Sequence, residues 1–249
     1  MARFTDKKLL KAAENHTLWL VKLMLSWGAD VNTRDYAGNT PLMLATRSGF
    51  TDAVIFLLSK GADANARNNA GQTAVMLNIA FSGQDGVYYS MEEREEKKRA
   101  LGEFYSFDAC STLHFQPVKY LVNRVPGLDL NLKDANGDTA FMYALKRGHL
   151  MKADYLLTHG ADIDAPDRDG MTPLMCTAGQ GYSHLVKFLC ERGADVNARD
   201  NNGETALMYG TRSGSPDILT YLVGHGADIN VRNNQGKTIL MLAAELGRM

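Results

Sequence analysis

The segment that decides the fold is residues 170–200, which read GMTPLMCTAGQGYSHLVKFLCERGADVNARD. Thr172 precedes Pro173, and this pair is typical of a helix start, because the hydroxyl caps a free N–H and proline lacks one. Apolar residues follow at helical spacing up to Gly181, and a second apolar pattern runs to the Gly-Ala-Asp triplet at Gly193. A glycine suits a helix C-terminus, where the backbone often needs a positive φ. The segment therefore predicts two short helices followed by a turn.

This unit recurs along the chain in one register. Gly-x-Thr landmarks keep this register, with threonines Thr40, Thr73, Thr139, Thr172, Thr205 and Thr238. The Gly-Ala-Asp triplet, spaced by 33 residues or a multiple of 33, begins at Gly28, Gly61, Gly160, Gly193 and Gly226, with a Gly-Leu-Asp variant at Gly127. Neither helix of a unit is able to bury its apolar face alone, so stability must come from stacking of neighbouring units.

The unit resembles the ankyrin repeat, whose signature is a Thr-Pro-Leu-His-x-Ala helix and a 33-residue period. The resemblance covers residues 1–249 as one ankyrin-repeat domain of about seven units, the last incomplete. It implies an all-α solenoid of stacked helix-turn-helix units with short hairpin-like loops. It also implies a non-enzymatic protein that binds a protein partner and needs no cofactor.

Methionine replaces the usual histidine of the first helix in every full match to the pattern. The column reads Met43, Met76, Met142, Met175, Met208 and Met241. A soft thioether ladder could form a binding surface or a redox-sensitive stack. Because this column faces the next unit in the family, we expect core packing instead.

Residues 81–115 break the repeat and are predicted to be a helical insertion within the third unit. Their centre is the charged run from Met91 to Arg99, in which glutamates precede basic residues by one helical turn. The alternative is a degraded extra repeat. The segment also holds seven aromatic residues, which either pin the insertion to the solenoid or anchor a partner.

The last unit carries apolar residues Ile239, Leu240, Met241, Leu242 and Leu246, and no second helix follows them. Solenoids normally end in polar capping units. We therefore expect this uncapped end to fray or to offer a further contact surface.

Composition narrows the function classes. The formal net charge is −1, which gives no global attraction to nucleic acid or to an anionic membrane. Three cysteines without a Cys-x-x-Cys pair predict no disulfide framework and no zinc site. A cytoplasmic location fits reduced thiols best. No pair of the six histidines has metal-ligand spacing, and no catalytic constellation is evident.

In the ankyrin family, partners usually dock on the concave face, which hairpin tips and first helices form. Matching the family column by column, and adding the aromatic insertion, gives a predicted partner-binding set: Tyr36, Asn39, Arg47, Asn69, Gln72, Tyr88, Tyr89, Phe104, Tyr105, Asp138, Lys146, Arg168, Met171, Gln180, Asn201, Glu204 and Arg212. A second tip column is basic, at Arg34, Arg67, Lys133, Arg199 and Arg232. Basic residues are common there in the family, so this column either belongs to the fold or makes a cationic groove for an acidic partner.

Two functions from different classes remain. The first is an adaptor or inhibitor that binds a protein partner. The second is a regulatory or targeting part of a larger enzyme truncated after Met249, which the unfinished seventh unit favours.

Overall fold

The computed structural model of the chain describes residues 4–81 and 112–247. Over these residues the secondary structure consists of 13 helices and no strand, as the all-α prediction requires. The chain divides into two compact units, residues 1–129 and residues 130–249.

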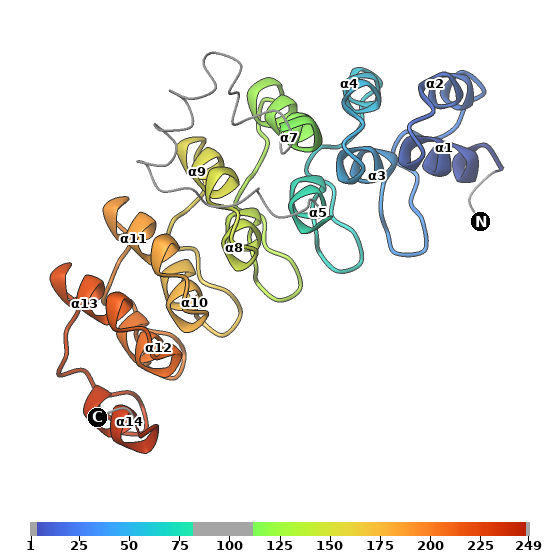
Figure 1. The fold of residues 1–249 in the computed structure, drawn as a ribbon. Coiled ribbons are helices and arrows are strands. Elements are labelled where there is room, and N and C mark those ends of the chain that lie inside the picture. Colours follow the sequence, from blue (N-terminus) through green and yellow to red (C-terminus); the bar gives the residue numbers. More distant parts are fainter. Residues whose placement is uncertain (1–3, 82–111, 248–249) are drawn as a thin grey trace, which may run out of the picture. The chain divides into compact units, whose positions relative to one another are not determined.

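The first unit is built from helix pairs in two layers. One layer holds the first helices α1 (Phe4–Glu14), α3 (Pro41–Arg47) and α5 (Ala74–Phe81). The other holds the second helices α2 (Leu18–Ser26), α4 (Thr51–Ser59) and α7 (Thr112–Arg124) (Figure 1). Helix α3 packs against α1 and α5 within its layer and against α4 across the layers. Each pair is therefore stabilised mainly by its neighbours, as expected for a solenoid.

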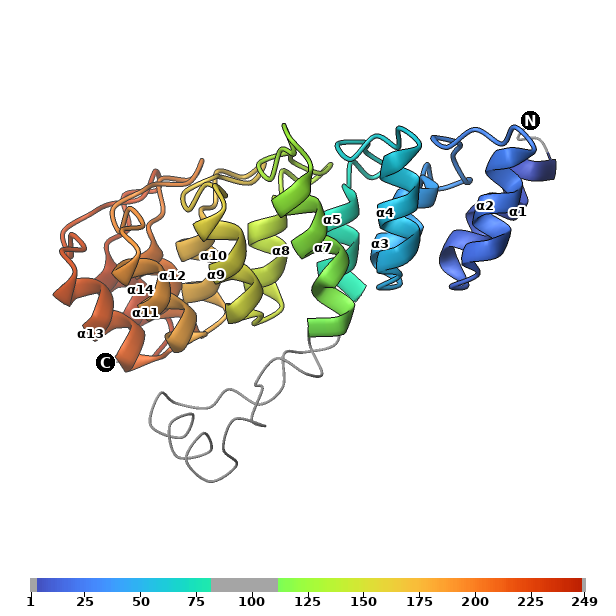
Figure 2. The ribbon, with the colours of Figure 1, turned by 90° about the horizontal axis from the view of Figure 1, so that it is seen from above.

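The second unit repeats this arrangement. Its first helices are α8 (Ala140–Lys146), α10 (Pro173–Gly179), α12 (Ala206–Ser213) and α14 (Ile239–Glu245). Its second helices are α9 (Leu150–Thr158), α11 (Ser183–Glu191) and α13 (Pro216–Gly224). Helix α10 packs against α8, α11 and α12. In both units the loops that lead from one helix pair to the next gather at one end of the helices (Figure 2).

Threonine and methionine together cap the N-termini of several first helices. The Met43 N–H donates to the Thr40 hydroxyl at 3.3 Å, and the Thr40 N–H donates to the Met43 sulfur at 3.4 Å. The same reciprocal pair forms at Thr73–Met76 and at Thr172–Met175. This is a capping box in which a thioether takes the place of the usual Glu or Gln side chain.

Burial confirms that the methionine column packs in the core. Met43, Met76, Met142, Met175 and Met208 are all at most 1% exposed. Met241 departs from this column, because 48% of it is exposed on α14.

The expected threonine cap is absent at one position. Thr205 makes no side-chain hydrogen bond to α12, and its hydroxyl is buried. The Met208 N–H instead donates to the Thr205 carbonyl at 3.0 Å. The predicted cap is therefore wrong here, because the first turn closes through the backbone.

The third repeat uses α5 and α7 as its two helices, and these helices pack together. The predicted range 81–115 is too wide at both ends, because Phe81 ends α5 and Thr112 begins α7. Phe115 is buried and belongs to the repeat core. That the intervening residues form an inserted helix remains a prediction, since residues 82–111 lie outside the described part.

Helix α14 presents apolar side chains to solvent. Leu240 is 81% exposed and Leu246 is 44% exposed, whereas Leu242 is buried. Helix α12 packs against α14, in which only Leu242 is buried, whereas α10 has six buried residues.

Replacing Met175 by leucine tests the thioether cap. Leucine keeps nearly the same volume but cannot accept from the buried Thr172 N–H. We expect unfolding free energy to fall by about 1 kcal/mol, the lower end of the cost of an unpaired buried polar group. Urea denaturation measures this loss. Met208→Leu is the matched control, because Met208 is equally buried and the Thr205–Met208 pair lacks the sulfur bond; equal losses would show that the bond contributes nothing.

Candidate partner-binding surface

Each hairpin tip is shaped by one acidic or amide side chain. Asp35 accepts from the Ala37 N–H at 2.9 Å and from the Asn39 N–H at 2.8 Å. The residues that repeat this role are Asn68, Asp134, Asp167, Asp200 and Asn233. The tips are therefore preorganised, so a partner that binds them meets a low ordering cost.

Adjacent hairpins within a unit are joined by main-chain hydrogen bonds. The Asn69 N–H donates to the Ala37 carbonyl at 2.9 Å, and the Asn69 side-chain amide donates to the Tyr36 carbonyl at 3.0 Å. Asn201 makes the equivalent pair with the carbonyls of Asp169 and Arg168. Asn69 and Asn201, predicted to bind a partner, are exposed but already use their amide N–H groups to hold the stack.

This close approach leaves no room for a side chain at the hairpin glycines Gly38, Gly137, Gly170 and Gly203. A Cβ on Gly137, whose φ is +85°, would lie 2.4 Å from the Arg168 nitrogen. Gly160 has a similar φ of +97° but nothing within 4 Å of that position. A comparison of Gly137 with Gly160 therefore separates the cost of a positive φ from the cost of steric crowding.

Side chains of the basic tip column donate hydrogen bonds to backbone carbonyls. Arg34 donates to the carbonyls of Gly38 at 3.0 Å and Arg67 at 2.6 Å. In the second unit, Lys133 donates to the Pro166 carbonyl at 2.6 Å and Arg199 to the Arg232 carbonyl at 2.6 Å. These side chains join one hairpin to the next, which favours a role in the fold over a cationic groove.

The predicted cations of the first helices are paired. Arg47 contacts Glu14 at 2.6 Å, and Lys146 contacts Asp138 at 2.6 Å. Arg212 pairs with Glu204 through both guanidinium nitrogens. Each of these predicted contact residues therefore faces a carboxylate of its own or the preceding repeat, and their contact with a partner stays a prediction.

The pairing changes the pKa values in the second unit. The hydrogen bond from Arg212, with a second from Asn233, lowers the pKa of Glu204 although burial opposes it. Burial lowers the pKa of Lys146, but the hydrogen bond and charge of Asp138 outweigh it, so the net shift is upward. Glu204 and Lys146 therefore remain ionised at neutral pH.

Three predicted contact residues are buried. Asn39 and Asp138 are each 6% exposed, and Glu204 is 8% exposed. Asn39 accepts from the Asn68 amide at 2.9 Å in the next hairpin. These side chains face the neighbouring repeat or their own helix, so they are corrected from partner contacts to parts of the scaffold.

The remaining predicted residues differ in accessibility. Gln72 and Met171 are half-buried, whereas Tyr36, Arg168 and Gln180 are exposed. Tyr36 is 96% exposed. Tyr88, Tyr89, Phe104 and Tyr105 lie outside the described residues, so their role stays a prediction.

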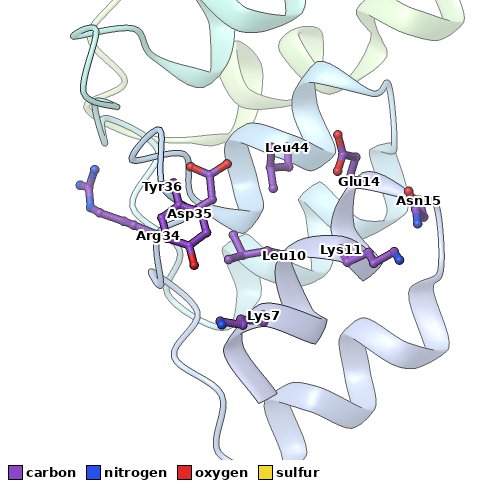
Figure 3. Close-up of a pocket in the computed structure, with 9 residues that line it drawn as sticks. All are labelled: Lys7, Leu10, Lys11, Glu14, Asn15, Arg34, Asp35, Tyr36 and Leu44. Atoms are coloured by element: carbon purple, nitrogen blue, oxygen red, sulfur yellow. The ribbon is translucent and has the colours of Figure 1, made fainter. Parts of the chain in front are cut away.

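The first unit contains a groove of about 530 Å³ that the column matching missed. It lies between α1 and the first hairpin, and its lining residues are Lys7, Leu10, Lys11, Glu14, Asn15, Arg34, Asp35, Tyr36 and Leu44 (Figure 3). Only Tyr36 of these was predicted as a contact. The available signal was Lys7 and Lys11, which the sequence spaces by one turn on the first helix.

Comparison with known families and structures agrees with this geometry. The family model for ankyrin repeats in three copies matches residues 9–89, 90–167, 106–200, 164–233 and 199–249. The chain belongs to the ankyrin-repeat family.

A solved structure with the same fold is the ankyrin repeat domain of Bcl-3, described as a unique member of the IkappaB protein family. It aligns with a TM-score of 0.74 and 27% identity, covering 94% of this chain and 92% of that domain. No curated protein sequence matches the chain significantly. Membership of this family indicates a protein–protein interaction module, and its fold is typically non-catalytic.

Two further searches concern only the described residues. They contain no group of three or more His, Cys, Asp or Glu side chains arranged for a metal ion. None of their helices combines the length and the apolar character needed to cross a membrane.

Substituting alanine for Gly137 should destabilise this ankyrin stack more than the same change at Gly160. Both positions carry the cost of a positive φ, but only Gly137→Ala also forces apart two hairpins. We expect the unfolding free energy to fall by about 2 kcal/mol more for Gly137→Ala, a typical penalty for overpacking. Thermal and urea unfolding of both variants measure the difference. Equal losses would mean that the hairpins separate without cost.

Removing the Arg212 side chain should lower the free energy of unfolding more than removing the Arg192 side chain. Glu204 has 11% of its side chain exposed, whereas the Asp154 side chain, which pairs with Arg192, is 42% exposed. Both arginines also lie over an aromatic ring, Tyr209 and Phe188 respectively. We expect Arg212→Gln to lower the unfolding free energy by about 1–2 kcal/mol more than Arg192→Gln, because it leaves a buried carboxylate unpaired.

The pH dependence provides a second check on the same pair. The pKa of Glu204 is lowered in the folded protein, so its contribution is present above the ordinary glutamate value of about 4.3 and is lost as the pH falls through the lower, folded value. The difference in stability between the wild-type protein and Arg212→Gln should therefore shrink as the pH falls below about 4.3. A difference that stays constant at low pH would assign it to packing rather than to charge.

Proposed function

We propose that the protein is an adaptor or inhibitor that binds a protein partner through its hairpin tips and first helices. The observation that carries the proposal is the contrast between a repeated backbone and unrepeated tip side chains. Side chains such as Tyr36, Arg168 and Gln180 are exposed on this surface. The rigid turns beneath them lower the entropy lost on binding, and aromatic and arginine side chains commonly dominate binding energy.

Two other segments support an extended contact. The aromatic residues Tyr88, Tyr89, Phe104 and Tyr105 of the predicted insertion have the composition of an interface anchor. The exposed Leu240 and Leu246 of α14 supply a second apolar surface. We propose both as additional contacts for a protein partner.

The proposal places this binding in the cytoplasm. Cys176 and Cys190 are buried, unpaired thiols. Burial raises the pKa of each thiol to about 11, so both resist oxidation at neutral pH. Unpaired cysteines are typical of reducing compartments.

A tip variant tests the proposed surface. Tyr36→Ala, Arg168→Ala and Gln180→Ala are combined in one chain. None of these three side chains joins an ion pair or a hairpin-to-hairpin bond in the described residues, and the bonds at Tyr36 and Arg168 use main-chain carbonyls, which alanine keeps. Proteins captured from cells by the wild-type chain are quantified by mass spectrometry, and the dissociation constant of the recovered partner is then measured. We expect at least about tenfold weaker binding for the variant, since hot-spot truncations exceed 1 kcal/mol.

The matched control truncates three exposed residues of the second helices, Lys22, Lys187 and Val223. It should bind the same partner as tightly as the wild-type chain does. A partner that the tip variant retains and the control variant loses would move the binding surface to the second helices and contradict the proposal. Melting temperatures of both variants verify that folding is preserved.

A further inference from the structure

We propose that the groove between α1 and the first hairpin binds a short acidic segment of the partner that carries an apolar side chain. This inference rests on the proposed function and names the chemistry of the partner at one site. It also moves the recognition of acidic groups away from the arginine columns, whose side chains are bonded within the fold.

The floor of the groove is apolar and closed. Leu10 from α1 is 7% exposed and Leu44 from α3 is 3% exposed. The volume of about 530 Å³ falls in the range of ligand sites, roughly 300–1,000 Å³. An inserted leucine or phenylalanine side chain would be removed from water there, which is favourable in proportion to the apolar area buried.

The positive charges at this groove are uncommitted. Lys7 and Lys11 lie one turn apart on α1, and both are exposed. Neither ammonium group forms an ion pair with any residue in the described part of the chain. Residues one turn apart project from the same helix face, so the two ammonium groups together can face one carboxylate or two adjacent ones.

The negative charges at the groove are already engaged. Glu14 is paired with Arg47 at 2.6 Å. Asp35 accepts from two backbone N–H groups of its own hairpin and from the Asn39 amide. Arg34 also lines the groove, but its guanidinium is held by two carbonyls, so Lys7 and Lys11 provide the positive charge for recognition. The lining is therefore complementary to an acidic segment.

Tyr36 lines the groove with an exposed aromatic side chain. Figure 3 draws Tyr36 with the other lining residues. Tyr36 is 96% exposed, and its carbonyl accepts from the Asn69 amide at 3.0 Å. A tyrosine offers both an aromatic face and a hydroxyl donor to a ligand. The narrow apolar floor favours a peptide over a nucleic acid, which is bound mainly through its phosphates and stacked bases.

The test uses the full chain and the blocked peptide EDLFDE. Two reference peptides keep the Leu-Phe centre: QNLFNQ is neutral and KKLFKK is basic. Methyl NMR of Leu10 and Leu44 reports occupancy of the groove, and a titration gives the dissociation constant. We expect EDLFDE to shift both residues, to bind at least about tenfold more tightly than QNLFNQ, and to weaken as salt rises.

Matched charge reversals locate the contact. Lys7→Glu with Lys11→Glu should weaken EDLFDE binding at least about tenfold. Lys22→Glu with Lys60→Glu makes the same change in net charge at a second groove, about 440 Å³ in volume, where both ammonium groups lie 5.5 Å from the centre of the Phe56 ring. This control should leave the affinity unchanged. Where the glutamate variant fails to fold, Lys7→Gln with Lys11→Gln replaces it and should give a smaller loss of the same sign.

Three outcomes would overturn the inference. They are no methyl shift at millimolar EDLFDE, equal affinity for QNLFNQ, and equal losses in the two charge-reversal variants. Equal or tighter binding of a ten-residue oligothymidylate would also overturn it and assign the groove to nucleic acid. The tip-variant experiment also changes Arg168 and Gln180 of the second unit, which do not line this groove, so the two proposals can fail separately.

Discussion

The stack depends on hydrogen bonds that join one hairpin to the next. The pair formed by the Asn69 N–H and the Ala37 carbonyl is one of them, and the second unit repeats it at Asn201 and Asn234. These bonds require two backbones to approach closely, and glycine with a positive φ makes that approach possible. Each first helix begins directly after a hairpin. The contacts between hairpins therefore also position the helix caps and the first helices.

Many polar side chains of the hairpins form hydrogen bonds within the scaffold. Carboxylates at Asp35 and Asp200 shape their turns, and arginines such as Arg34 and Arg199 hold the next hairpin through its carbonyls. Charge that stabilises a scaffold in this way is unavailable for partner recognition, because a partner would have to displace the internal bond. Specificity therefore depends on the side chains that the scaffold leaves unpaired, and Tyr36, Lys7 and Lys11 are exposed examples in the first unit.

The methionine column has a related consequence for the core. A thioether fills an irregular space and accepts a weak hydrogen bond, so Met43 contributes packing to the neighbouring repeat and a cap to its own helix. A leucine would supply the first property only. The exposed Met241 in the last helix marks where this stacking stops, because it no longer faces a following helix in the described chain.

The sequence by itself determined the local structure of this protein. The period of 33 residues, the glycines at the turns and the threonines at the helix starts predicted the helix pairs, since caps and turns depend on neighbours within a few residues. It did not determine the ends of the third repeat's insertion, where Phe81 and Phe115 belong to helices. The ion pair between Arg47 and Glu14, and the groove floor formed by Leu10 and Leu44, depend on the tertiary structure. These contacts join residues about one repeat apart, and a long side chain finds its partner only after neighbouring units have stacked.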